Sequence, residues 1–189
     1  MAWLTTKDGR HFNTDWLNGD NNKPIISKHS GDEISLSLAL DTWARNASGI
    51  KAASRGEQYD GSVFGRVGLN DEAKAEQIQR FVKGHTEKNT IYRGLEDISD
   101  EQYKQYTKVG SDYKEPGLSS WSTDKKTATG YGTHGKNNIV FIKESATKDA
   151  RSIGNRVGTD TEKEVIVDTM KSKISKVEKS KYTTYVYLK

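Results

Sequence analysis

Residues 161–167 read TEKEVIV, and this stretch decides how the C-terminal half of the chain is interpreted. Its apolar part, 165–167, is β-branched and favours a buried strand. Glu162 and Glu164 lie two positions apart, so on a strand both carboxylates would project from the same face. Two like charges held that close cost free energy unless a cation or a reaction needs them. The stretch therefore predicts a strand whose edge carries a pair of carboxylates.

Secondary-structure patterns place helices before strands, which predicts an α+β fold. Ser99 and Gln102 form a capping-box signature, and Asn70 is the expected N-cap of another helix. Helices are expected over 32–47, 70–84 and 99–110. Strands are expected over 89–95, 118–123, 138–143, 164–169 and 181–189. The stretch 49–68 reads as irregular, and the lysine-rich 171–181 as a solvated turn and strand edge.

The length of 189 residues fits one domain with a small appendage. Residues 1–30 are expected to form an N-terminal arm, in which 2–6 and 10–14 flank a hairpin turn at Lys7-Asp8-Gly9. Residues 31–189 are expected to form the main domain.

Composition excludes several classes of protein. Without cysteine the chain has no disulfide, no thiolate catalysis and no Cys-based metal site. The four histidines lack metal-ligand spacing, so no metal is predicted. The net charge of +4 is a mild excess that does not make a nucleic-acid footprint by itself. The sequence shows no signal peptide, and no apolar run approaches the roughly 20 residues that span a bilayer.

Two further segments carry polar side chains at predicted strand ends. Arg93 follows two apolar residues in IYRGL, so its side chain could face a cleft. Ser120 and Ser122 in SSWST would share one strand face, with Trp121 on the other. Each feature taken alone also fits an ordinary surface strand.

Taken together and in this order, IYRG, SSWST and EKEV resemble the arginine, serine and Glu-x-Glu motifs of the R-S-E class of mono-ADP-ribosyltransferases. This class contains arginine-modifying bacterial toxins and phage-encoded enzymes. The resemblance covers residue 89 to the C-terminus and implies two packed, mainly antiparallel β-sheets with N-terminal helices at one side. It also implies that NAD is the substrate and that nicotinamide is released.

The resemblance assigns roles to the motif residues. Glu164 would hold the ribose 2′-hydroxyl and stabilise the positive charge that develops as the nicotinamide bond breaks. Glu162 would orient the acceptor and accept its proton. Arg93 would grip the pyrophosphate with two parallel hydrogen bonds. Ser120 would hold Glu164 in its productive rotamer.

The serine motif departs from the family pattern, because Trp121 stands between the two serines where the family usually has Ser-Thr-Ser. Ser120 aligns better, and Ser122 remains an alternative. Gly94, Ser122 and Tyr131 join the predicted NAD-binding residues, Tyr131 from the glycine-rich loop 124–138. The loop 152–161 lies where the family recognises its acceptor.

The expected partner is a target protein with an acceptor arginine, and a nucleic-acid acceptor is an alternative because the catalytic half of the site would look the same. A monomer without membrane attachment is expected, acting by resemblance in the cytoplasm of a host or target cell. NAD glycohydrolase activity is a further alternative, against which Glu162 argues because water needs no second carboxylate. A non-enzymatic phage or toxin-associated binding module is the alternative from another class.

Two other interpretations are rejected, the first because its motif match is due to chance and the second because its motif is missing. Gly130, Gly132 and Gly135 spell G-x-G-x-x-G but precede a predicted strand, whereas a Rossmann turn runs from a strand into a helix. Ser120 lacks the G-x-S-x-G elbow of a serine hydrolase.

Overall fold

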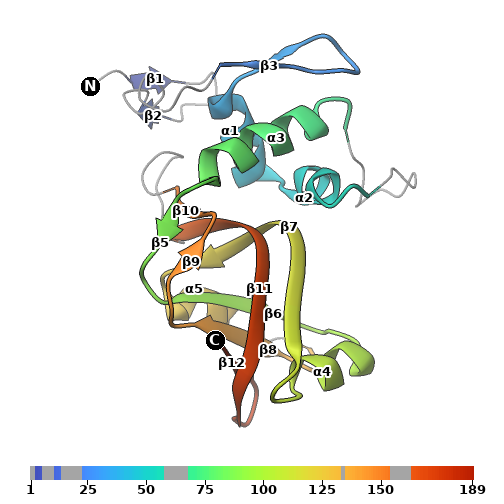
Figure 1. Cartoon of the computed structure of the whole chain (residues 1–189), viewed down its shortest axis with the longest axis vertical. Coiled ribbons are helices and arrows are strands. Elements are labelled where there is room, and N and C mark those ends of the chain that lie inside the picture. Colours follow the sequence, from blue (N-terminus) through green and yellow to red (C-terminus); the bar gives the residue numbers. More distant parts are fainter. Residues whose placement is uncertain (1–2, 6–10, 14–22, 58–67, 133–134, 154–162) are drawn as a thin grey trace.

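The computed structural model describes residues 3–5, 11–13, 23–57, 68–132, 135–153 and 163–189. Figure 1 shows a helical layer of α1, α2 and α3 above a strongly curled sheet. The helices are α1 (Leu36–Arg45), α2 (Ser48–Ser54), α3 (Asp71–Val82), α4 (Asp100–Tyr106) and α5 (Lys125–Gly130). The strands are β1 (Trp3–Thr5), β2 (His11–Asn13), β3 (Ile25–Ile26), β4 (Glu33–Ile34), β5 (Thr86–Glu87), β6 (Ile91–Leu95), β7 (Asp112–Ser122), β8 (Ile139–Lys143), β9 (Thr147–Lys148), β10 (Ala150–Ser152), β11 (Glu164–Lys179) and β12 (Thr184–Leu188). The predicted α+β class is confirmed.

One six-stranded sheet forms most of the domain, with strand order β10-β11-β12-β8-β6-β7. The last strand in this order, β7, also pairs with β11, so the five strands from β11 to β7 close into a ring. Within the described part of this sheet only the β8–β12 pairing is parallel. The two packed, mainly antiparallel sheets that were expected are therefore two halves of one curled sheet, joined through the long strand β11.

A bend in β7 and β11 makes this curl possible. The register of the two strands shifts between Asp168 and Met170, where Thr169 has a φ of +54°. On the partner strand Gly117 has a φ of +69° and donates its N–H to Thr169 Oγ1 at 3.3 Å. An extra residue at a bulge bends a strand and increases its twist. In Figure 1 both β7 and β11 bend just below the helical layer.

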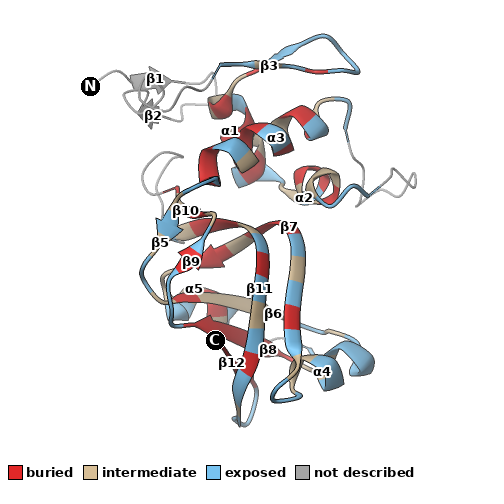
Figure 2. Cartoon of the chain, viewed as in Figure 1, coloured by how far each residue is buried: buried red, intermediate tan, exposed pale blue. Residues whose placement is uncertain are grey.

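The two faces of the bent sheet enter different cores. Ile166 and Leu118 pack against buried residues of α1, α2 and α3. Val165 and Val167, on the opposite face of β11, pack with Trp121 in the interior of the curl. In Figure 2 buried residues are concentrated at the end of β11 that lies under the helices, and on α1 and α3. Because side chains alternate between the two faces of β11, this strand contributes to both cores and connects the helical layer to the sheet.

Side-chain capping hydrogen bonds mark the starts of α1 and α4, but not the start of α3. Ser35 Oγ accepts the N–H of Leu38 at 3.2 Å and caps α1, which begins at Leu36. The helix does not begin at residue 32 as predicted, because Glu33 and Ile34 pair in the β3–β4 hairpin. Asn70 is the N-cap of α3 as predicted, but its side chain contacts residues of this hairpin instead of capping the helix. The capping box predicted for α4 is confirmed. Helix α4 ends at Tyr106, before the predicted end at 110.

Several short elements differ from the prediction. Helix α2 lies in the stretch predicted to be irregular, and α5 lies in the loop after the serine motif. The lysine-rich segment is a continuation of β11 to Lys179. The strands β1 and β2 of the predicted N-terminal hairpin pair in antiparallel register. The division between Ser30 and Gly31 falls within the β3–β4 hairpin and stays a prediction.

Candidate active site

A cleft of about 340 Å³ opens where β6, β7 and the start of β11 meet α2 and α5. It is bounded by Lys51, Arg93, Gly94, Ser120, Ser122, Tyr131 and Glu164, among others. The described residues of the predicted site therefore come together from three strands, β6, β7 and β11, and from the end of helix α5. Their roles remain predictions.

Glu164 is the first residue of β11 and is half-buried at the cleft. Its carboxylate Oε1 accepts a hydrogen bond from the indole Nε1 of Trp43 on α1 at 2.7 Å. Trp43 is buried, with only 3% of its surface exposed. A hydrogen bond from a neutral donor to a carboxylate favours the ionised form of the acid. The carboxylate is thus anchored by the helical layer, which sequence patterns did not indicate.

The two candidate serines occupy one face of β7. Ser122 lies directly opposite Glu164 in the β7–β11 register, whereas Ser120 lies opposite Ile166. Both line the cleft, while Trp121 between them points into the sheet interior, where its Nε1 donates to Ser119 Oγ at 3.0 Å. The predicted alternation is confirmed. The register places Ser122, the alternative choice, directly across from Glu164.

Arg93 lies on β6 and forms an ion pair with Glu115 of β7. Both side chains are 18% exposed. Glu115 Oε2 also accepts the hydroxyl hydrogen of Tyr113 at 2.9 Å. Burial, together with the Glu115 carboxylate, raises the pKa of Tyr113 well above its usual value, so this phenol stays a donor. The hydrogen bond from Tyr113 to Glu115 and the ion pair of Glu115 with Arg93 together hold the guanidinium at the cleft.

Lys51 of α2 is a second cation in the cleft. Burial lowers the pKa of its ammonium, and the charge of the nearby Arg93 lowers it further, against the opposing influence of Glu164. Its Nζ lies 5.1 Å from the centroid of the Trp43 ring. Helix α2 is held on β7 by Ser54, whose Oγ accepts the N–H of Leu118 at 2.8 Å. Two cations therefore share the cleft with Glu164.

Gly94 is required by the packing of α5 on β6. A Cβ atom at this position would lie 2.0 Å from the carbonyl oxygen of Ala128, which no side chain tolerates. Tyr131 immediately follows α5 and is 54% exposed at the cleft. Gly130 ends α5 and Gly132 precedes β8, so the rejection of the dinucleotide fingerprint is confirmed.

Glu162 lies outside the described residues. The neighbouring Lys163 is described and has a φ of +48°, and β11 begins only at Glu164. Lys163 is therefore not part of the extended strand, and the alternation of side chains along β11 begins at Glu164. That Glu162 and Glu164 share one face stays a prediction.

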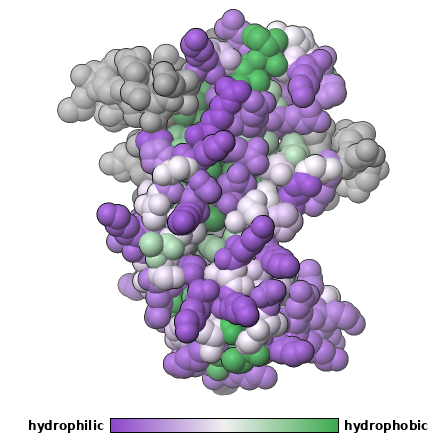
Figure 3. Space-filling view, in the orientation of Figure 1, coloured by the Kyte–Doolittle hydropathy of each residue, from purple (hydrophilic) through white to green (hydrophobic). Residues whose placement is uncertain are grey.

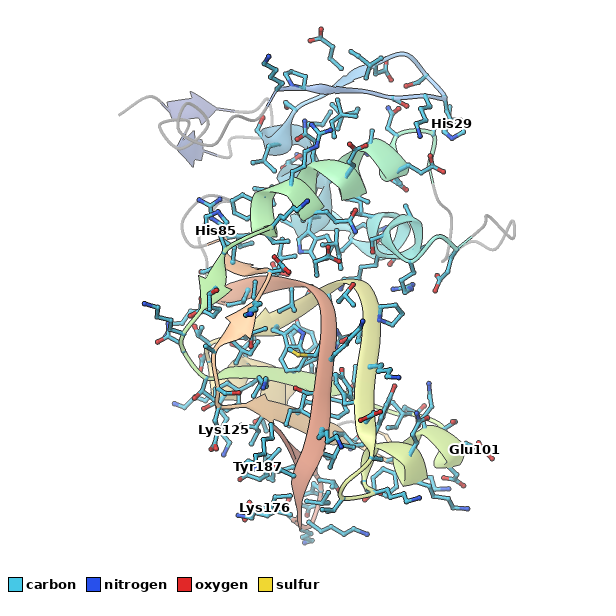
Figure 4. The ribbon with its side chains drawn as sticks, viewed as in Figure 1. His29, His85, Glu101, Lys125, Lys176 and Tyr187 are labelled. Atoms are coloured by element: carbon cyan, nitrogen blue, oxygen red, sulfur yellow. The ribbon has the colours of Figure 1, made fainter. Side chains whose placement is uncertain are left out.

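Other candidate chemistry is not assembled in the described part of the chain. No group of three or more His, Cys, Asp or Glu that could hold a metal ion occurs there. Figure 4 shows His29 in the turn of the β3–β4 hairpin and His85 just after α3, far from each other. None of the described helices is long and apolar enough to cross a membrane. On the face in Figure 3, hydrophobic residues form small separate patches among hydrophilic ones.

Solved structures share this architecture. The Vis toxin of Vibrio splendidus, an ADP-ribosyltransferase solved in complex with agmatine, matches with a TM-score of 0.58 and 18% identity over 93% of this chain and 79% of its own. The chain has the ADP-ribosyltransferase fold.

Two other structures extend this result. C3stau2 from S. aureus, solved with NAD, matches this ADP-ribosyltransferase fold with a TM-score of 0.55 and 17% identity, over 81% of this chain and 85% of its own. Exoenzyme S from Pseudomonas aeruginosa, in complex with human 14-3-3 protein beta and bound to carba-NAD, matches with a TM-score of 0.57 and 10% identity, over 80% and 71%. No protein-family model and no curated protein matches the sequence.

Proposed function

We propose that this protein is an NAD-dependent mono-ADP-ribosyltransferase, which releases nicotinamide and transfers ADP-ribose to an acceptor. The observation that carries the proposal is the anchored carboxylate of Glu164, held by Trp43 at a cleft that also contains Arg93. The fold it shares with solved ADP-ribosyltransferases, one with NAD and one with carba-NAD, supports NAD as the substrate.

Glu164 is the proposed catalytic carboxylate. Cleavage of the bond between nicotinamide and ribose leaves positive charge on the sugar, as in glycoside cleavage. A fixed carboxylate beside the sugar stabilises this charge in the transition state more than in the ground state, which lowers the barrier. The hydrogen bond from Trp43 fixes the carboxylate before substrate arrives, so little reorganisation is needed during the reaction.

Arg93 and Lys51 are the proposed phosphate ligands. Both cations line the cleft, and the charge of Arg93 lowers the pKa of Lys51, so the two repel each other. The pyrophosphate of NAD would offset this repulsion. Arg93 suits bidentate contact with phosphate oxygens, whereas Lys51 acts as a compact point charge. Glu115 keeps the guanidinium at the cleft while no phosphate is bound.

The proposed acceptor is an arginine side chain on a target protein, with Glu162 orienting the guanidinium and accepting its proton. The complex of Vis with agmatine, an arginine analogue, supports this acceptor class. In mono-ADP-ribosylation the new bond joins the ribose C1 to a guanidinium nitrogen, while the bond to nicotinamide breaks and the acceptor proton leaves. A nucleic-acid acceptor is the alternative within the same activity.

Release of nicotinamide from NAD by the purified protein, with and without agmatine, tests the activity. We expect Glu164→Gln to reduce release by about 100-fold or more under both conditions, because the transition-state charge loses its partner. Glu178→Gln is the matched control on the same strand, since Glu178 contacts Lys176 and Tyr187 at the far end of β11 (Figure 4). Near-normal release by Glu164→Gln, or none by the wild type, would overturn the proposal.

The acceptor role of Glu162 is tested by separating transfer from hydrolysis. We expect Glu162→Gln to lose transfer to agmatine while keeping much of the NAD hydrolysis, because water needs no second carboxylate to orient it. The measurement is ADP-ribosyl-agmatine against free ADP-ribose in one reaction. Equal loss of both products would remove the acceptor role. Hydrolysis without any transfer by the wild type would instead favour an NAD glycohydrolase.

A further inference from the structure

We infer that Trp43 is a positioning residue, whose indole N–H holds the carboxylate of Glu164 in one orientation and in its ionised form. The inference rests on the proposed function, because it concerns how the proposed catalytic carboxylate is prepared. Trp43 belongs to α1 in the helical layer and Glu164 to the sheet, 121 positions apart in the chain. Their 2.7 Å hydrogen bond therefore links the two layers at the cleft.

The surroundings of Trp43 leave its indole one orientation. The side chain is only 3% exposed and belongs to the core formed by α1, α2, α3 and the sheet residues Leu118 and Ile166. Lys51 Nζ lies 5.1 Å from the ring centroid. An indole nitrogen is a donor only, and a buried donor without an acceptor costs free energy. The packed ring thus presents its N–H at a fixed point, and Glu164 Oε1 occupies that point.

The bond has two consequences for Glu164. A glutamate at the start of a strand can rotate about its side-chain bonds, and a contact to a packed indole selects one rotamer. A donor to a carboxylate also favours the ionised form over the protonated one. Ser122 also lies across from Glu164, but on a neighbouring strand of the same sheet, so it does not link Glu164 to the helical layer. Trp43 makes the orientation of the carboxylate depend on the docking of α1.

Trp43→Phe removes the donor and keeps an aromatic ring. We expect kcat for nicotinamide release to fall about tenfold or more, the effect of losing one hydrogen bond to a charged group, with little change in KM for NAD. We also expect the acid limb of the pH–rate profile to move to higher pH, because less of the carboxylate is ionised at a given pH without its donor.

Phe81→Leu is the matched control for lost packing. Phe81 is 1% exposed in the same core, with the Arg151 guanidinium carbon 4.3 Å from its ring centroid, and it lies outside the cleft. This variant should lose stability while its pH–rate profile stays in place. If Trp43→Phe does not fold, replacement of Trp43 by benzothienylalanine, in which sulfur takes the place of N–H, removes the donor at nearly unchanged shape.

A second readout does not depend on turnover. In ¹H–¹⁵N spectra, the Trp43 indole signal of the wild type should shift with pH as the carboxylate protonates, and Glu164→Gln should abolish this shift. An unshifted pH–rate profile with unchanged kcat in Trp43→Phe, or an indole signal that does not respond to pH, would overturn the positioning role while leaving the proposed function intact. Absence of nicotinamide release by the wild type would overturn the function itself.

Discussion

At the scale of single residues, the charges of the cleft indicate the ligand that it takes. Lys51 and Arg93 lie in one cleft, and both burial and the guanidinium charge lower the pKa of Lys51. The carboxylate of Glu115 forms an ion pair with Arg93. Keeping two cations this close costs free energy, which an anionic ligand would recover.

Lys51 gives this argument a pH-dependent test. We expect Lys51→Met to raise KM for NAD roughly tenfold at pH 7, because the variant loses one hydrogen bond between charged groups. As the pH rises, the Lys51 ammonium loses its proton and the protein should lose affinity for NAD. Because the pKa of Lys51 is lowered, this loss should begin at a lower pH than it would for a lysine with an ordinary pKa. Lys51→Arg, which does not titrate in this range, should keep its affinity there. A KM unaffected by Lys51→Met would remove Lys51 from the phosphate site.

Apart from Tyr131, which follows α5, the cleft residues that sequence patterns identified lie on strands. Arg93, Ser120, Ser122 and Glu164 all reach the cleft, because alternation along predicted strands determines which side chains share a face. Trp43, Lys51 and Glu115 were not identified. In the sequence, Trp43 fits the apolar face of an amphipathic helix. Its indole Nε1 finds its acceptor, Glu164, only when α1 packs beside β11.

At the scale of elements, contact between α5 and β6 shapes one wall of the cleft. The carbonyl oxygen of Ala128 approaches the backbone of β6 so closely that only glycine fits at position 94. The motif residue after Arg93 is therefore explained by packing. Since α5 leads directly into Tyr131, the same contact places this tyrosine at the cleft.

Gly94→Ala tests this packing. We expect a loss of about 1–3 kcal/mol in the free energy of unfolding, typical of overpacking, because α5 must move away from β6. Gly130→Ala is the matched control in α5 itself, where an added Cβ has nothing within 4 Å and a helical alanine is favoured over glycine. Urea unfolding measures both. Equal stability of the two variants would contradict the close approach.

The elements that sequence patterns missed are short or highly charged. Helices α2 and α5 have 7 and 6 residues, too few for a helical period to stand out from glycine-rich surroundings. The second half of β11 was interpreted as a solvated turn and strand edge, because lysines dominate it. Ile174 is nevertheless buried there and packs into the interior of the curled sheet. One buried residue among lysines is too weak a signal for a strand.

At the scale of the whole molecule, β7 and β11 form a partition between two cores. Ile166 faces the helices, whereas Val165 and Val167 on either side of it face the interior of the curl. The α+β class followed from the order of predicted elements. The closure of β7 onto β11 did not, because it depends on paired irregularities at Gly117 and Thr169 that have no sequence period. Because the partition is shared, neither core is expected to unfold alone.

Ile166→Ala tests whether the two cores unfold together. Ile166 is fully buried, and truncation of such a residue costs about 2–5 kcal/mol through lost burial and the cavity that remains. We expect tryptophan fluorescence and far-UV circular dichroism to report one coincident transition in urea, at a lower midpoint than in the wild type. Ile26→Ala, at a side chain that is 57% exposed, should leave the midpoint nearly unchanged. Separate transitions for the two probes would mean that the helical layer detaches from a sheet that remains folded, and the anchoring of Glu164 by Trp43 would then be lost before the sheet itself unfolds.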